Sequence, residues 1–409
     1  MRRHLFAAFV LIPAAGFLAV NAGLFSAPKP AVAKAAMTAS PPAARPCDTR
    51  CDAGWLDENL RLDQLQVVGT GKSYKQRPAP GMLRLVRMGG RKHAEALDFG
   101  QPSLTAQLDG DVRSLAFDVA YDPKGGQYRN PAGASMAMEL LPDEFVTAMK
   151  KPGFKVIHVL DVDYNSSCLA LADCLKQVAD WSSANPRHLP LTIVLRANDI
   201  KTPMPGATEP KVYDTAAMDA LDSEIRAAFA PGQLLTPDHI QGDHPSLREA
   251  ALAHAWPKLG DARGKVLFVL EDTPEKIRLY QGTRKSLEGR AMFVATDETA
   301  PAAAFVSLPD PQKDGGRIAR AVKAGFMVLT RSDLDTREAR QNLTQRRDAA
   351  FASGAQIVQT DFAVADSAIG AYRVSLADHP GAMCGKGLAP ERCIKFESAP
   401  VRTAIATAP

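Results

Sequence analysis

The run Val266-Leu267-Phe268-Val269-Leu270 is apolar throughout, and Leu191–Leu195 (LTIVL) is nearly so. A third run, VIHVLDV, covers Val156–Val162. Continuous apolar runs, unlike runs that alternate with polar residues, are typical of parallel strands buried on both faces. These stretches therefore predict a parallel sheet that is covered by helices.

Other short apolar or β-branched runs complete a set of eight predicted strands. The eight are Leu65–Gly69, Ser114–Val119, Val156–Val162, Leu191–Leu195, Val266–Leu270, Met292–Ala295, Phe326–Leu329 and Gln356–Val358. Helical stretches are expected at 168–182, 216–229, 313–324 and 336–352, the last ending before Gly354. Strands and helices interspersed in this way predict an α/β fold of the TIM-like (β/α)8 barrel type. A doubly wound open sheet is the alternative, but no Gly-x-Gly-x-x-Gly follows the first strand.

The N-terminus predicts a signal peptide over residues 1–33. Arg2 and Arg3 precede an apolar run over 5–20, and Ala31-Val32-Ala33 is a small-x-small cleavage site. An uncleaved membrane anchor is the alternative, although about 16 apolar residues are short for spanning a bilayer. Residues 34–55 are expected to form an Ala- and Pro-rich linker, and residues 56–400 one barrel domain. The chain is therefore expected to be exported, to the periplasm or the extracellular space.

The charge of the chain argues against nucleic-acid binding. The 409 residues carry a net charge of +4, of which Arg2, Arg3 and Lys29 supply +3, so residues 34–409 carry 4 − 3 = +1. Nucleic-acid binding needs a concentrated basic surface. Bulk charge gives no support for membrane attraction either, so we expect contact with a lipid surface to be transient at most.

The six cysteines fall into three close pairs. An even number of cysteines in an exported chain predicts disulfides. Zinc binding is the rival interpretation, but no histidine lies at zinc-ligand spacing from any pair. The predicted bonds, each of which would fix a local turn, are Cys47–Cys51, Cys168–Cys174 and Cys384–Cys393.

The residues that follow the strands are the candidates for chemistry, because β/α barrels place their sites at the carboxyl ends of the strands. The first four predicted strands carry the polar segments Gly69-Thr70-Gly71-Lys72-Ser73-Tyr74-Lys75, Ala116-Phe117-Asp118-Val119, His158 with Asp161-Val162-Asp163-Tyr164, and Arg196-Ala197-Asn198-Asp199.

These segments, taken together, resemble the calcium-dependent phosphoinositide phospholipase C family over about residues 60–393. Members read G-T-H-N-S-Y-H after the first strand, E-x-D-V in the second, and then G-F-x-V-x-H-x-x-D-x-D-Y and W-S-x-x-N-P-x-H-x-P. The matching residues here are Gly69-Thr70, Ser73-Tyr74, Asp118-Val119, His158, Asp161, Asp163-Tyr164, Trp181-Ser182, Asn185-Pro186, His188, Thr330-Arg331-Ser332-Asp333 and Thr360-Asp361. The resemblance implies a barrel phosphodiesterase that uses two histidines and a bound Ca²⁺ ion.

This chain departs from the family at four positions. Gly71 replaces the first histidine, Lys72 an asparagine ligand of calcium, and Ala116 and Arg196 the two glutamate ligands, so only Asp118 remains. Calcium takes about six to eight oxygen ligands, commonly with several carboxylates. Two cations in their place would also repel a dication. We therefore predict no cofactor and no metal.

Two functions follow from this degenerate site. In the first, the chain is a metal-independent phosphoric diester hydrolase in which Lys72, Arg196 and Arg331 bind the phosphate. His158 would then be the general acid, and Asp118 the base, with help from Asp161 or Asp163. In the second, the barrel is a pseudoenzyme that only binds an anionic headgroup or partner. A glycerophosphodiesterase is a weaker third option, because we find no paired glutamates. The expected partner is a phospholipid headgroup or a small phosphodiester.

Each candidate residue also has a purely structural interpretation. His158 could be an ordinary core histidine, Lys72 and Lys75 a solvated loop, and Arg331 a partner of Asp333 or Asp361. Asp161 could cap a strand end. We expect His188 to be structural and Phe362 to pack in the core rather than to stack on a sugar.

Overall fold

Eight parallel strands form a barrel in this computed structural model, which describes residues 53–376 and 383–384. Each strand pairs with its neighbour in the chain, and β9 returns to pair with β1 in the register Val67↔Ile357 to Thr70↔Thr360. The barrel is nearly closed, because β6 and β7 meet only through the parallel bridge Ala295↔Phe305. The predicted TIM-like barrel is therefore confirmed. The barrel strands are β1 (Leu65–Thr70), β2 (Ser114–Asp122), β4 (Leu191–Ala197), β5 (Val266–Leu270), β6 (Met292–Val294), β7 (Phe305–Ser307), β8 (Met327–Arg331) and β9 (Ile357–Thr360).

The third predicted strand is wrong. The segment forms a short strand, β3 (Gly153–Val156), which pairs antiparallel with the end of β2, from Val119↔Val156 to Asp122↔Gly153. The chain then turns, and Asp161 has a φ of +66°, a conformation that no strand contains. The apolar residues after Val156 in the segment 156–162 therefore belong to a loop and not to a barrel strand. The barrel strand missing from the prediction is β7, which has three residues.

The helices alternate with the strands, and most lie on the outside of the barrel. The helix expected over 336–352 is two helices, because Asn342 adopts a left-handed conformation with φ +50° between them. The second ends as predicted at Gly354, whose φ of +82° suits glycine. The helices are α1 (Ala53–Asn59), α2 (Pro80–Gly89), α3 (Arg91–Leu97), α4 (Leu104–Asp109), α5 (Ala132–Met136), α6 (Asp143–Lys150), α7 (Leu171–Ala184), α8 (Thr215–Ala228), α9 (Pro237–Gln241), α10 (Leu247–Leu252), α11 (Leu259–Ala262), α12 (Pro274–Gln281), α13 (Pro311–Lys323), α14 (Arg337–Gln341) and α15 (Gln345–Ser353), with two 3-10 turns, Leu62–Gln64 and Pro231–Gln233, and a last short strand, β10 (Met383–Cys384).

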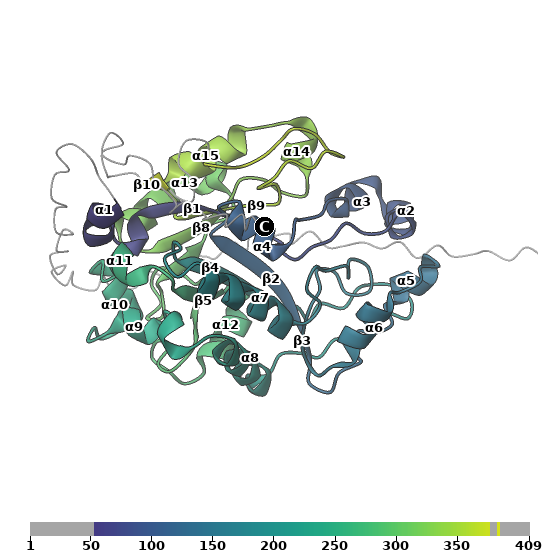
Figure 1. Cartoon of the computed structure of the whole chain (residues 1–409), viewed down its shortest axis with the longest axis horizontal. Helices are drawn as coiled ribbons and strands as arrows, with labels where there is room; N and C mark the ends of the chain where they lie inside the picture. Colours follow the sequence, from purple (N-terminus) through teal and green to yellow (C-terminus); the bar gives the residue numbers. More distant parts are fainter. Residues whose placement is uncertain (1–52, 377–382, 385–409) are drawn as a thin grey trace, which may run out of the picture.

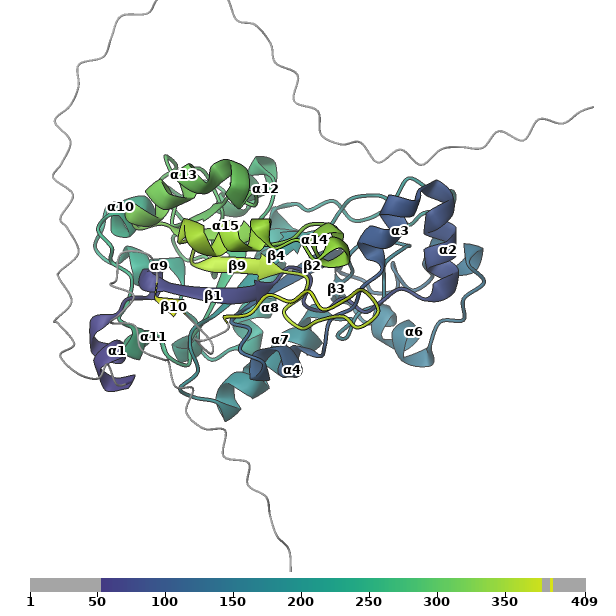
Figure 2. The same ribbon diagram turned by 90° about the horizontal axis from the view of Figure 1, so that it is seen from above.

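The two ends of the molecule are built differently. Helices α2, α3, α5 and α6 follow β1 and β2 in the chain, and Figures 1 and 2 show α2, α3 and α6 together at one end. Helices α1, α9, α10 and α11 lie at the opposite end (Figure 1). The first group extends from the carboxyl ends of the strands, which we call the mouth of the barrel, so the site expected in a β/α barrel lies on this side.

The barrel strands are buried on both faces, as their composition predicts. All five residues of β5 are fully buried. Between β6 and β7, the rings of Phe293 and Phe305 lie 5.2 Å apart and both contact the buried Trp256. Each fully buried large apolar side chain stabilises the fold by about 1.5–3 kcal/mol. The predicted burial of this sheet is therefore confirmed.

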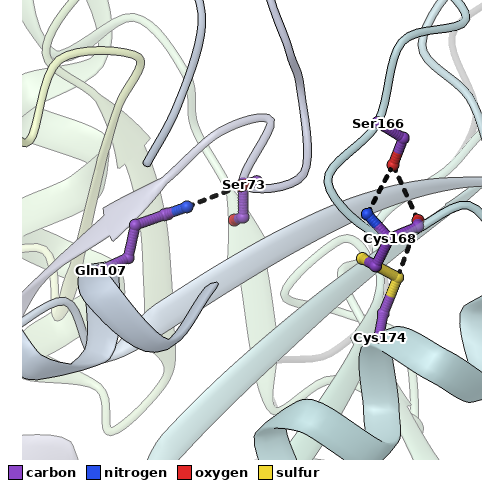
Figure 3. Close-up of a disulfide and its surroundings, with 5 residues drawn as sticks. All are labelled: Ser73, Gln107, Ser166, Cys168 and Cys174. Carbon is purple, nitrogen blue, oxygen red and sulfur yellow. Dashed lines mark hydrogen bonds between the residues drawn. A yellow bond between two sulfur atoms is a disulfide. The ribbon is translucent and has the colours of Figure 1, made fainter. Parts of the chain in front are cut away.

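One of the three predicted disulfides lies within the described residues. Cys168, in the loop before α7, is bonded to Cys174 in the first turn of that helix, and Figure 3 shows the hydroxyl of Ser166 accepting from the amide of Cys168. Cys47, Cys51 and Cys393 lie outside the described residues, as do the predicted signal peptide and residues 34–52 of the predicted linker. Residues 53–55 of that linker belong to α1. Within 53–376 and 383–384, no helix is both long and apolar enough to span a membrane.

Candidate functional site

A cluster of two cations and a carboxylate lies where β1, β8 and β9 end. Lys72 follows β1, Arg331 is the last residue of β8, and Asp361 follows β9. Lys72 Nζ lies 3.1 Å from Asp361 Oδ2, and Arg331 Nη2 lies 3.4 Å from the same oxygen. Burial by itself would raise the pKa of Asp361, but Lys72 and Arg331 outweigh it and lower that pKa. The carboxylate is therefore ionised and holds both cations at the mouth.

Gly71 has little room for a side chain. A Cβ atom there would lie 3.0 Å from Arg331 Nη2 and 3.0 Å from Asp361 Oδ1. The space beside Gly71 is thus taken by this cluster. A glycine at this position, where related sequences have histidine, is therefore consistent with the close packing of Arg331 and Asp361.

Arg196, the next to last residue of β4, binds a carboxylate on the neighbouring strand end. Its Nε and Nη2 atoms lie 2.9 and 2.5 Å from Oε2 of Glu271, which follows β5. Its Nη1 atom donates to the carbonyl of Gly71 at 3.0 Å and lies 3.8 Å from Asp118 Oδ1. Burial would lower the pKa of Arg196, but Glu271 and Asp118 outweigh it and raise the pKa. Most donors of this guanidinium are therefore used within the protein.

His158 is held by a buried ion pair. Its Nδ1 lies 2.7 Å from Asp163 Oδ2, and the Lys75 ammonium lies 3.3 Å from the same oxygen. Lys75 is fully buried and also donates to the carbonyls of Leu97 and Phe99. The interpretation of Lys75 as part of a solvated loop is therefore wrong. Because Asp163 takes one ring nitrogen, Nε2 of His158 remains available for chemistry.

Asp118 and Ala116 lie on β2. Asp118 Oδ2 accepts a hydrogen bond from Tyr74 Oη at 2.6 Å. Burial and Asp118 together raise the pKa of Tyr74, so the phenol stays protonated. Ala116 is fully buried and contributes only backbone groups: its N–H donates to Ser73 Oγ at 2.8 Å, and its carbonyl accepts from the Ser73 N–H at 3.1 Å. The structure thus brings Asp118 to Arg196, whereas Gly71 and Ala116 add no titratable group.

Four buried polar atoms around these residues have no hydrogen-bond partner in the described part of the protein. Two are donors and two are acceptors, namely Arg331 Nε, Gln359 Nε2, Asp163 Oδ1 and Asp361 Oδ1. Buried polar groups in folded proteins are nearly always satisfied by protein, water or ligand. A mixed set of donors and acceptors suits a ligand that carries both acidic oxygens and hydroxyl groups.

Three other candidate residues have structural roles. Asp161 accepts from Ala132 N, Thr208 N and Thr208 Oγ1, so it joins two loops. His188 is bonded to Ser182 Oγ at 2.7 Å and to the Leu189 carbonyl. Phe362 is buried and packs against Phe99, as predicted.

Sequence reasoning missed Glu271 and Gln359 as residues of this site. Glu271 directly follows the apolar run of β5, and this position at the end of a strand could have identified it. Gln359 lies inside β9, and its side-chain oxygen lies 3.3 Å from Arg196 Nη2. No sequence pattern distinguishes such a residue from an ordinary buried amide.

These residues do not fit a calcium ion. The guanidinium of Arg196 lies between Asp118 and Glu271, 3.8 Å from Asp118 Oδ1 and 2.5 Å from Glu271 Oε2, so a positive charge already lies between these two carboxylates. The Lys72 ammonium is held beside the same mouth by Asp361. Within the described residues, no group of three or more His, Cys, Asp and Glu side chains could hold a metal ion. A dication would have to displace or oppose fixed positive charge.

One family profile matches most of the chain. The sequence profile described as "Phosphoinositide phospholipase C, Ca2+-dependent" matches residues 60–385. Among solved structures, a calcium-dependent phosphoinositol-specific phospholipase C from Pseudomonas sp. is 16% identical, with 77% of this chain and 94% of that chain covered and a TM-score of 0.47. A Ca²⁺-dependent phosphatidylinositol-specific phospholipase C from Streptomyces antibioticus is 17% identical, with 74% and 94% covered and a TM-score of 0.46. The phosphatidylinositol-specific phospholipase C of Listeria monocytogenes is 11% identical, with 75% of this chain and 93% of that chain covered and a TM-score of 0.40. No curated protein matches the chain.

Proposed function

Because the chain belongs to the calcium-dependent phosphoinositide phospholipase C family, we propose that it is a phosphoric diester hydrolase acting on a phosphoinositide or a related diester without a metal ion. The observation that carries this proposal is the pair of His158 and Asp163. The short contact between Nδ1 and Asp163 orients the imidazole and leaves Nε2 to serve as a general acid.

The cleavage step needs one proton at the leaving oxygen. As the bond between phosphorus and the leaving alcohol breaks, His158 Nε2 gives its proton to that oxygen. The ammonium group of Lys75 forms an ion pair with Asp163 at 3.3 Å and so holds the carboxylate in place while the charge of the imidazole changes. A positioned acid of this kind contributes a factor of roughly 10² to 10⁴ to the rate.

Lys72 and Arg331 are the cations best placed to hold the phosphate. Both reach Asp361 at the mouth, and each keeps donors that this single carboxylate does not use. Arginine and lysine both stabilise the charge of a phosphoryl transition state. Arg196 has a different role in this proposal. It holds Glu271 and Asp118 in the absence of a metal and contributes its positive charge.

The incoming hydroxyl needs a base, for which Asp118 remains our candidate. Its Oδ2 atom accepts from Tyr74, and its Oδ1 atom is 3.8 Å from Arg196. The carboxylate is thus held beside the cations that would bind the phosphate. The proton would pass from the attacking hydroxyl to Asp118 as the new bond to phosphorus forms.

A non-catalytic barrel is the second candidate. The contacts of Arg196 favour it, because they use most of its donors within the protein. Gly71 and Ala116, which replace two catalytic positions of the family, cannot exchange protons through their side chains. Such a protein would bind an anionic lipid headgroup at Lys72 and Arg331 and release it unchanged. In either case we expect export and only transient contact with a lipid surface.

Hydrolysis of phosphatidylinositol in mixed micelles, with and without a chelator, tests the proposal. We expect turnover that the chelator does not change and that falls by about 10² to 10⁴ in His158→Ala. His244→Ala is the matched control, because His244 follows α9 by three residues, and α9 lies at the opposite end of the molecule from α2 and α3 (Figure 1). Turnover abolished by the chelator would disprove metal independence. Binding without turnover would establish the second candidate.

A further inference from the structure

The segment that carries His158 leaves the sheet just after β3. The Ile157 N–H still donates to the carbonyl of Asp118 in β2, at 3.1 Å. Residues 157–163 belong to no strand, however, and the chain turns at Asp161, whose φ is +66°. Such a segment lacks the continuous ladder of hydrogen bonds that fixes a residue within a strand. The position of His158 therefore depends on contacts from the side chains of neighbouring loops.

Asn198, which follows β4, supplies such a contact. Its side-chain Nδ2 donates to the carbonyl of Ile157 at 2.8 Å and to the carbonyl of His158 at 3.1 Å. A primary amide has two N–H bonds, and here they serve two consecutive peptide groups. The backbone N–H of Asn198 donates to the carbonyl of Val119 in β2 at 2.7 Å, so Asn198 is itself fixed to the barrel.

Thr208 joins the same two loops further along the chain. Its N–H and its hydroxyl both donate to the carboxylate of Asp161 at 2.8 Å. Asp161 lies three residues beyond His158, whereas Asn198 contacts the peptide of His158 itself. Thr208 thus offers a matched comparison, in which the two loops are joined without contact to that peptide.

His158 is therefore held at two points. Asp163 holds the ring through Nδ1 at 2.7 Å, and Asn198 holds the peptide to which the side chain is attached. The place and direction of Nε2 follow from both contacts together, and a displacement of about 1 Å can reduce a rate by about 10²-fold. We propose that Asn198 is a positioning residue, which acts through His158 and does not contact the substrate. This inference rests on the proposed function, in which His158 is the general acid.

Initial rates on phosphatidylinositol in mixed micelles, measured for the full-length wild type and its variants, test this role. We expect Asn198→Ala to lower kcat about tenfold and to change KM less than about twofold, because Lys72 and Arg331 stay in place. Asn198→Asp should lower kcat further, by about 10²-fold, because the isosteric carboxylate has no N–H to donate and faces two carbonyl oxygens. If Asn198 only filled space, Asn198→Asp would instead be the milder change. Thr208→Val, the matched control, should keep kcat within about twofold of the wild type.

The ¹⁵N NMR signals of the His158 ring provide a measurement that does not depend on turnover. These two signals report which ring nitrogen carries the proton, and this depends on the contact of Nδ1 with Asp163. The chain has eight histidines, so the signals are identified by their absence in His158→Ala. We expect Asn198→Ala to shift both signals and Thr208→Val to leave them at their wild-type positions.

The outcomes separate this inference from the proposed function. Wild-type kcat and unshifted ring signals in Asn198→Ala would overturn the positioning role and leave the proposed function intact. Equal losses in Asn198→Ala and Thr208→Val would also overturn it, because they would show only a general need to join the two loops. Absence of turnover in the wild type would contradict the proposed function, and the ring signals would then decide the role of Asn198 by themselves.

Discussion

Arg196 contacts three strand ends at the mouth of the barrel. Its guanidinium reaches Glu271 after β5, the carbonyl of Gly71 after β1, and Gln359 in β9. The side chains of Arg196 and Glu271 are 24% and 19% exposed, so removing either charge would leave the other poorly solvated. The residue therefore stabilises the mouth whether or not it also contacts a ligand.

We predict that Arg196→Met lowers the free energy of unfolding by about 2–4 kcal/mol, because Glu271 and Asp118 lose their shared cation. The measurement is urea unfolding followed by circular dichroism. The double variant Arg196→Met with Glu271→Gln should recover at least half of this loss. The control is Arg317→Met, which breaks a surface pair and should cost less than about 1 kcal/mol. A loss as small as that of the control would show that the Arg196 pair is not structural.

At the scale of single elements, the disulfide fixes the start of α7. It joins Cys168 to Cys174 across six residues, and the Cys168 carbonyl also accepts from Ser166 Oγ at 2.7 Å. Figure 3 shows these contacts together, beside the hydrogen bond from Gln107 to the carbonyl of Ser73. The loop before α7 follows the segment that carries His158 and Asp163, so the bond lies near the site in sequence.

Replacing both Cys168 and Cys174 by serine should lower the free energy of unfolding by about 2 kcal/mol, because the closed loop is short. Thermal unfolding of the variant and of the wild-type protein, each with and without reductant, measures this effect. Reductant should lower the melting temperature of the wild type. It should lower that of the variant less, because the variant has no Cys168–Cys174 bond to reduce. Equal melting temperatures for the oxidised wild type and the variant would contradict the prediction.

At the scale of the whole molecule, His188 connects the end of α7 to the start of β4. It is bonded to Ser182 Oγ, and its ring lies 5.3 Å from that of Trp181. Burial, only partly opposed by the Leu189 carbonyl, lowers the pKa of His188 from 6.5 to about 4. His188 thus packs between a helix and a strand, which agrees with the structural role expected for it.

The lowered pKa of His188 makes folding depend on pH. Between about pH 4 and 6.5 the unfolded chain binds a proton that the native protein excludes, so stability falls as the pH falls through this window. From about pH 7 to about pH 5, His188 should account for about 2 kcal/mol of the decrease. Urea unfolding at the two pH values measures this effect. Between pH 7 and pH 5, the free energy of unfolding of His188→Gln should fall by about 2 kcal/mol less than that of the wild type. Identical slopes for the wild type and His188→Gln would refute the assignment.

The sequence by itself determined a parallel sheet covered by helices, because apolar runs such as that of β5 are suited to burial on both faces, and its eight predicted strands with helices between them favoured a barrel over an open sheet. Polar residues in or directly after the apolar runs, together with the family resemblance, made Lys72, Asp118, His158 and Arg196 candidates, and their roles stay predictions. Local patterns could not separate a buried loop from a strand at 156–162, nor detect the three residues of β7.

Only the tertiary structure decided how the charges pair. Arg196 meets Glu271, which lies 75 residues away in the chain, and Lys72 meets Asp361, which lies 289 residues away. Such partners follow from which strand ends are neighbours around the nearly closed barrel, and this is a property of the assembled sheet. The space beside Gly71 arises in the same way, because side chains from several strands must be placed before it has a shape.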